Sequence, residues 1–155
     1  LDETNNVQLF ESLYLVLHII TSLLSYSLIT ISLVTSFCIF IQDSNIKKMK
    51  YNRIINNFLP SMYESEVLAI RFLYLTIIFL IISLVSGLYY FIETGNKLIY
   101  FFNEKVIFSL ITLFLTLTII IVRVSRGLSG NMVFKMVLLS YLLISFSYFG
   151  VRLLN

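Results

Sequence analysis

The chain has 155 residues, of which 59% are hydrophobic and 12% are charged, and its mean hydropathy is +0.95. A soluble domain usually spends about a quarter of its residues on charge, so this composition leaves too little polar surface for a globule in water. The net charge of +3 comes from scattered residues, which argues against a nucleic-acid-binding groove. The single cysteine has no partner for an internal disulfide. These features indicate an integral membrane protein.

Four apolar stretches match the about 20 residues that a helix needs to cross the hydrocarbon core of a membrane. They cover residues 13–41, 67–92, 106–124 and 132–154. The first is long enough to tilt or to project beyond the bilayer. We therefore predict one all-α domain over residues 1–155, an integral membrane bundle of four transmembrane helices. The first residue is Leu1 and not Met, and no signal peptide precedes the first span, so we expect this chain to be a piece of a longer one.

The distribution of Lys and Arg predicts the orientation of the spans, because cytoplasmic loops carry an excess of these residues. One side has Lys47, Lys48, Lys50, Arg53, Arg71, Arg123, Arg126 and Lys135. The other side has Lys97, Lys105 and Arg152. We expect a multi-pass protein of the cell (inner) membrane with both ends of this chain on the outward, periplasmic side. Basic residues near span ends, such as Arg123, are expected to extend their stems to the headgroups.

The segment between the first two spans is predicted to hold a short interfacial helix. Apolar residues recur there at helical spacing beside asparagines: Tyr51, Ile54, Ile55 and Phe58. This pattern is typical of an amphipathic helix on the cytoplasmic membrane surface, and a plain loop is the alternative. Pro60 ends the segment, and Ser61 with Glu64 predicts a capping box at the start of the second span. Glu64 and Glu66 both suit the positive end of that helix.

His18 is the only histidine, and it is predicted to lie in the outer part of the first span. An ionisable group at membrane depth is costly and suggests a function, and neutral imidazole is an axial ligand of haem iron. The alternative is a hydrogen bond to a neighbouring helix. Polar residues recur every three or four positions along one face of the same helix, if Ile29 is counted as the member between Ser25 and Ser32. They are His18, Ser22, Ser25, Ser32 and Ser36. Small hydroxyl residues let helices approach closely, so this stripe predicts that His18 faces the bundle.

No pattern indicates a reaction centre. The sequence shows no nucleophile paired with a base, no phosphate-binding glycine loop and no pair of carboxylates that would share a cleft. We therefore expect no catalytic residue and no enzyme activity.

Six short motifs occur in order along the chain. They are Leu17-His18-Ile19 with Leu24-Ser25-Tyr26, Leu59-Pro60-Ser61 with Glu66, Ser86-Gly87, Asn103-Glu104-Lys105, Arg123 with Gly127-Leu128-Ser129-Gly130, and Tyr148-Phe149-Gly150-Val151-Arg152-Leu153-Leu154. Together they resemble the C-terminal half of the cytochrome c assembly family, membrane proteins that handle haem. The chain departs from that pattern because it has no tryptophan-rich outward loop, and Ile121 or Val122 replaces a histidine expected in the third span. It therefore resembles a reduced branch of the family.

The resemblance implies that the protein binds or presents haem on the outward side, with His18 as an axial ligand of the iron. Arg152 and then Lys105 are the expected partners of the haem carboxylates, and plain anchoring of helix ends is the alternative. Met132 and Met136 are predicted to lie at the wrong depth for a second iron ligand. That ligand would come from missing upstream spans, another chain or water.

The expected partners are membrane lipids, haem, other cytochrome c assembly proteins and upstream spans packed against the bundle, but no nucleic acid. Two other functions stay open. One is a haem-free scaffold or accessory subunit of a larger complex. The other is a transporter component, which ranks third because the spans show no convincing inverted repeats or interrupted helices.

Overall fold

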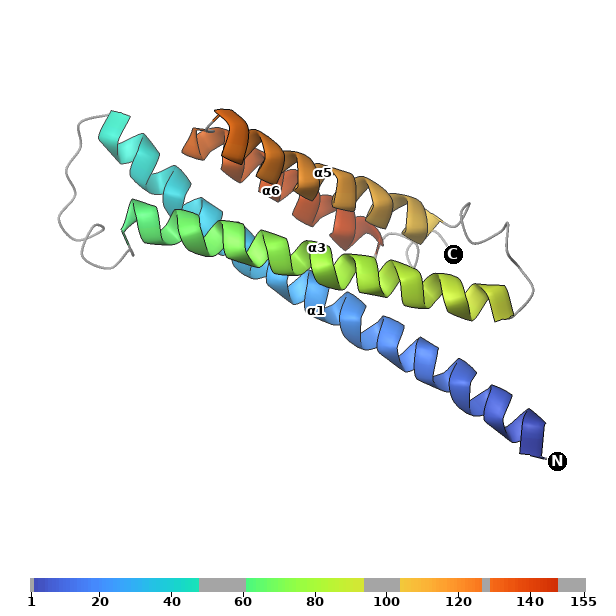
Figure 1. The fold of residues 1–155 in the computed structure, drawn as a ribbon. Helices are drawn as coiled ribbons and strands as arrows, with labels where there is room; N and C mark the ends of the chain where they lie inside the picture. Colours follow the sequence, from blue (N-terminus) through green and yellow to red (C-terminus); the bar gives the residue numbers. More distant parts are fainter. Residues whose placement is uncertain (1, 48–60, 94–103, 127–128, 148–155) are drawn as a thin grey trace.

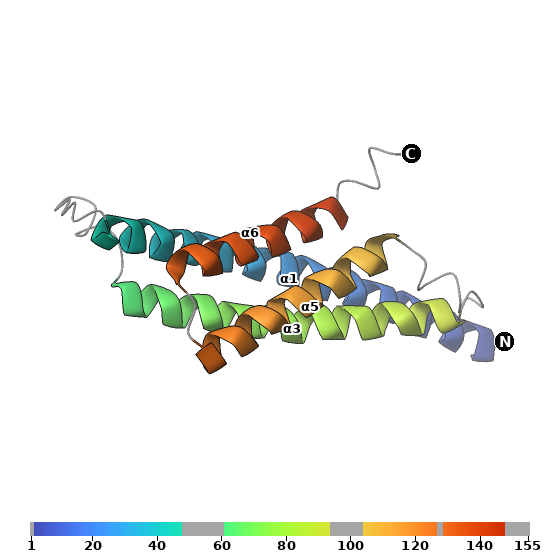
Figure 2. The same ribbon diagram turned by 90° about the horizontal axis from the view of Figure 1, so that it is seen from above.

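The structure is a computed structural model that describes residues 2–47, 61–93, 104–126 and 129–147. Its helices are α1 (Asp2–Lys47), α3 (Met62–Glu93), α5 (Glu104–Arg126) and α6 (Gly130–Ser145). Successive helices run in opposite directions (Figure 1). Contacts join α1 to α3, α3 to α5, α5 to α6 and α6 back to α1, and Figure 2 shows α6 lying along α1. The described chain is thus a four-helix bundle, which confirms the predicted all-α class.

Three of the helices are long and apolar enough to cross a membrane. At a rise of 1.5 Å per residue, the 46, 32 and 23 residues of α1, α3 and α5 reach about 69, 48 and 35 Å, against a hydrocarbon core of about 30 Å. The apolar α6 has 16 described residues, which reach about 24 Å. Residues 148–154 of the fourth predicted span lie outside the described residues. The chain is therefore a multi-pass membrane protein, and its long α1 projects beyond the other helices (Figure 1).

The predicted capping box forms at the start of α3. The backbone N–H of Ser61 donates to Oε2 of Glu64 over 3.0 Å, and the N–H of Glu64 donates to Oγ of Ser61 over 3.3 Å. These reciprocal bonds satisfy backbone donors that a helix N-terminus otherwise leaves unpaired. The interfacial helix predicted just before it, with Tyr51 and Phe58, lies outside the described residues.

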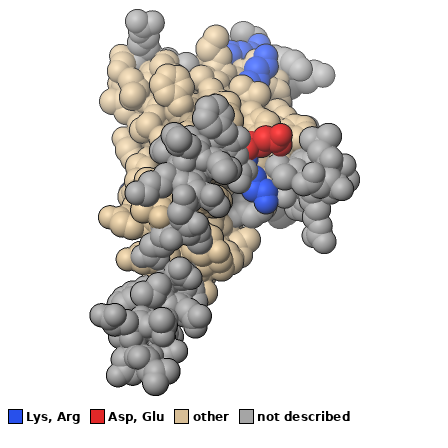
Figure 3. Space-filling model, turned by 90° about the vertical axis from the view of Figure 1, so that its right-hand side faces the viewer, with Lys and Arg blue, Asp and Glu red and all other residues tan. Residues whose placement is uncertain are grey.

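Small hydroxyl residues fill much of the bundle interior. Ser25, Ile29, Ser32 and Ser36 of α1 are almost fully buried, which confirms that the polar stripe faces the other helices. Most buried hydroxyls donate to a carbonyl three or four residues earlier in their own helix, as Ser36 does to Leu33. Ser32 instead donates across to the carbonyl of Ala69 in α3 over 3.4 Å. Their small size lets the helices pack closely. Many large apolar side chains are exposed on the outer surface, and few charged side chains appear among the described residues on the face in Figure 3.

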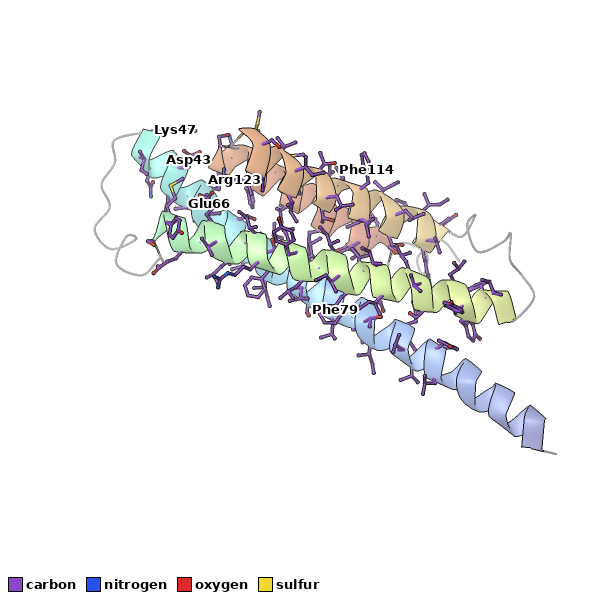
Figure 4. The ribbon with its side chains drawn as sticks, in the orientation of Figure 1. Asp43, Lys47, Glu66, Phe79, Phe114 and Arg123 are labelled. Carbon is purple, nitrogen blue, oxygen red and sulfur yellow. The ribbon has the colours of Figure 1, made fainter. Side chains whose placement is uncertain are left out.

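One end of the bundle, here called the ion-pair end, contains Asp43, Glu66, Arg123 and Gly130. Arg123 of α5 forms an ion pair with Glu66 of α3, and Figure 4 shows both at the same end as Asp43. Only 16% of the Arg123 side chain is exposed. The prediction that Arg123 extends to the headgroups is therefore wrong, because the guanidinium reaches inward to a carboxylate. Glu66, expected to support a helix terminus, joins two helices instead.

Candidate functional site

A cavity of about 430 Å³ lies toward the other end of the bundle, and residues from all four helical segments line it. Its volume falls in the range of about 300–1,000 Å³ that is usual for small-molecule and cofactor sites. Seven of the fourteen lining residues are apolar, among them Leu80, Val106 and Ile144, and apolar atoms form most of the lining surface. The polar lining consists of His18, Lys105 and five serines. Such a site suits a largely apolar ligand with a few fixed polar contacts.

His18 is half-buried and joins α1 to α3 at the edge of this cavity. Its Nδ1 lies 2.7 Å from the backbone oxygen of Ser83 and 3.2 Å from the Ser83 hydroxyl oxygen. The structure confirms the hydrogen-bonding interpretation of His18, because the side chain bonds a neighbouring helix, while the iron-ligand interpretation stays a prediction for a residue that also lines a cavity. The two interpretations are compatible because an imidazole has two ring nitrogens and only Nδ1 takes part in the Ser83 contact.

Four of the five cavity serines use their hydroxyl protons within the protein. Ser22 donates to the carbonyl of Ile19 over 2.9 Å and Ser25 to that of Ser22 over 2.8 Å. Ser109 donates to the carbonyl of Val106 over 2.9 Å. Ser147 donates to the carbonyl of Lys105 over 3.2 Å. Because these protons are engaged, the hydroxyl oxygens of these four serines offer lone pairs and can act toward a ligand only as hydrogen-bond acceptors.

Two of the three predicted site residues lie at the cavity, and the third cannot be placed among the described residues. His18 and Lys105 line the same cavity, and Lys105 is exposed at its rim. Arg152 lies outside the described residues. Met132 and Met136 do not belong to the cavity lining, and Met136 packs against the apolar cluster around Leu73. Among the described residues that line the cavity, His18 alone is of a type that commonly ligates haem iron.

Two features of the site were missed by sequence reasoning. Ser83 has no sequence signal for its role, since it lies 65 positions from His18 and its backbone oxygen makes the shorter contact. The aromatic rings of Tyr14 and Tyr89 stack one helical turn beyond His18, with centroids 5.6 Å apart and planes at 12°. This stack adds a second contact between α1 and α3 near the site. Within the described residues no group of three or more His, Cys, Asp or Glu could hold a metal ion.

The fold and the cavity define a class, namely a multi-pass helical membrane protein with one histidine on a largely apolar internal site. The model of the Cytochrome C assembly protein family matches residues 1–155, so the chain belongs to this family. An uncharacterized 28.8 kDa protein from the nifR3-like 5' region of Azospirillum brasilense is 31% identical over 139 residues, which are 88% of this chain and 49% of that protein. The chain therefore spans about half the length of this relative. No solved structure matches it.

Proposed function

We propose that this protein binds haem in the cavity beside His18 and presents it on the outward side of the membrane, without chemical turnover of its own. The observation that supports this most is that the single histidine lines a 430 Å³, mainly apolar cavity in a protein of the cytochrome c assembly family. A neutral imidazole suits haem iron, and an apolar lining suits the porphyrin ring. When bound, haem supplies an iron centre that accepts the imidazole lone pair.

The haem carboxylates need positive partners in this arrangement. Lys105 lines the cavity and carries a point charge. Arg152 follows α6 in the sequence, and its guanidinium can grip a carboxylate through two hydrogen bonds. If these residues serve haem, Lys105→Gln and Arg152→Gln lower the haem retained after purification. Lys135→Gln is the matched control, because Lys135 is exposed on α6 and does not line the cavity.

The direct test is an absorption spectrum of the purified protein in detergent after haem has been supplied. We expect a Soret band that is lost in His18→Asn, a variant that keeps a hydrogen-bond donor for Ser83 but has no ligand nitrogen. With one histidine, the haem of the monomer should be five-coordinate or mixed-spin. A clean bis-histidine, low-spin spectrum would contradict this assignment. No Soret band in the parent protein would refute haem binding and favour the haem-free scaffold.

The orientation is part of the same proposal, because haem is to be presented outside the cytoplasm. The excess of Lys and Arg near the ion-pair end supports a cytoplasmic location for that end. A reporter fused after Asn155 should therefore be exported, and one fused at Lys48 should stay in the cytoplasm. The reverse result would place His18 toward the cytoplasm and remove the presentation role.

The proposed protein partners include further spans of a longer chain, because this chain is shorter than its relative. The chain covers 49% of its Azospirillum brasilense relative. We therefore propose that further spans pack against this bundle in a full-length protein, where they would provide the second axial ligand. Other cytochrome c assembly proteins are the proposed recipients of haem.

A further inference from the structure

The short contact between His18 and Ser83 favours a proton on one of the two ring nitrogens. The Ser83 backbone oxygen lies 2.7 Å from Nδ1, and a carbonyl oxygen can only accept a hydrogen bond. An unprotonated Nδ1 would direct its own lone pair at that oxygen. The Ser83 hydroxyl oxygen is farther away, at 3.2 Å, and could donate to Nδ1 only if the closer carbonyl contact were repulsive. The shorter contact therefore favours an Nδ1–H group.

We infer that Ser83 is a positioning residue that holds the proton of neutral His18 on Nδ1 and leaves the lone pair of Nε2 for a Lewis-acidic centre in the cavity. Histidines that bind metals usually donate their other ring N–H to a carbonyl or carboxylate, which fixes the tautomer and the ring orientation. The identity of the centre as haem iron rests on the proposed function. The tautomer itself rests only on the contacts of His18.

The cavity lining supports this assignment independently. Ser22, Ser25, Ser109 and Ser147 donate their hydroxyl protons to backbone carbonyls and so present acceptor oxygens. An Nε2 lone pair adds another electron donor to these four serine oxygens, and Lys105 is the cation of the described lining. Such a lining favours an electron-deficient ligand such as a metalloporphyrin.

Ser86 modulates the same carbonyl. Its hydroxyl donates to the Ser83 backbone oxygen over 3.0 Å, so it competes with the imidazole for that acceptor. Removal of this hydroxyl in Ser86→Ala should strengthen the Nδ1–H bond to Ser83 and make Nε2 a stronger donor to the metal. The variant leaves the carbonyl and the helix in place.

The test is nitrogen NMR of protein labelled with ¹³C,¹⁵N-histidine in lipid nanodiscs. His18 is the only histidine, so a purification tag without histidine leaves one imidazole in the spectrum. In mildly alkaline buffer, we expect Nδ1 to show a protonated, pyrrole-type resonance and Nε2 an unprotonated, pyridine-type resonance, distinguished by the coupling of Nε2 to Cδ2. Ser83→Ala should keep this tautomer because its carbonyl remains, and Ser86→Ala should move the Nδ1 proton downfield.

A protonated Nε2 in the parent protein would overturn the inference. A switch of the proton to Nε2 in Ser83→Ala would do the same, because the hydroxyl and not the carbonyl would then control the ring. Addition of a diamagnetic metalloporphyrin should shift the Nε2 resonance and leave Nδ1 protonated. If the tautomer is as expected but neither this shift nor a Soret band occurs, the haem function fails and the role of Ser83 stands.

Discussion

Gly130 is the first residue of α6, and it lies so close to α1 that even a methyl group does not fit. A Cβ atom at this position would lie 2.8 Å from Ile39 Cγ2, 3.1 Å from Asp43 Cβ and 3.2 Å from the Ile39 backbone oxygen. Carbon atoms pack at about 3.5–4.0 Å, so the nearest contact is short by about 0.7 Å. Because a backbone oxygen also limits the space, α6 must move away from α1. Overpacking of this kind costs about 1–3 kcal/mol, and we expect Gly130→Ala to lower the free energy of unfolding by about 2 kcal/mol.

Reversible unfolding in mixed micelles, followed by circular dichroism, measures this change. Ser129→Ala is the matched control, because Ser129 is exposed and its side chain makes no capping hydrogen bond. Ile39→Leu removes Cγ2 at nearly constant volume and should partly rescue Gly130→Ala, so the two changes together cost less than their sum. Equal stability of Gly130→Ala and Ser129→Ala would refute the close-packing argument.

Two further predictions use the same unfolding measurement. Arg123→Met leaves the Glu66 carboxylate without its ion partner and should cost about 3 kcal/mol, at the lower end of the range for buried pairs because 29% of the Glu66 side chain is exposed. Replacing both residues with Met should recover most of that loss, and a double variant less stable than Arg123→Met would contradict this. Ser61→Ala removes the acceptor for the Glu64 N–H and should cost about 1 kcal/mol, whereas Ser61→Thr keeps it. Equal stability of the two Ser61 variants would exclude a contribution from the cap.

The features predicted correctly from the sequence depend on local spacing. The three long apolar helices follow from runs of apolar residues, and the capping box of Ser61 and Glu64 requires only a separation of three positions. The burial of Ser25 and Ser32 follows from the helical period of the polar stripe. Each of these depends on one helix at a time, so no knowledge of the neighbouring helices was needed.

The contacts that were missed join different helices. The position of Glu66 near a helix start predicts that it stabilises that terminus. Its ion-pair partner Arg123 lies on another helix and comes close only when α3 and α5 pack. The contact of His18 with the Ser83 backbone oxygen involves an atom that every residue type has, so no residue pattern can encode it. Sequence periodicity shows which face of a helix is buried, but the rotation and depth of the facing helix decide which atoms meet.

The two ends of the bundle have different packing, and the proposed ligand site lies at the more loosely packed end. At the ion-pair end, Gly130 allows α6 to touch α1, and the void beside Glu66 and Arg123 is only about 10 Å³, close to the space for one water. At the His18 end, the same four helices enclose about 430 Å³. Changes at Gly130 or Arg123 should therefore alter stability first, whereas His18→Asn should alter ligand binding with little change in stability, since the asparagine amide can still donate to the Ser83 carbonyl.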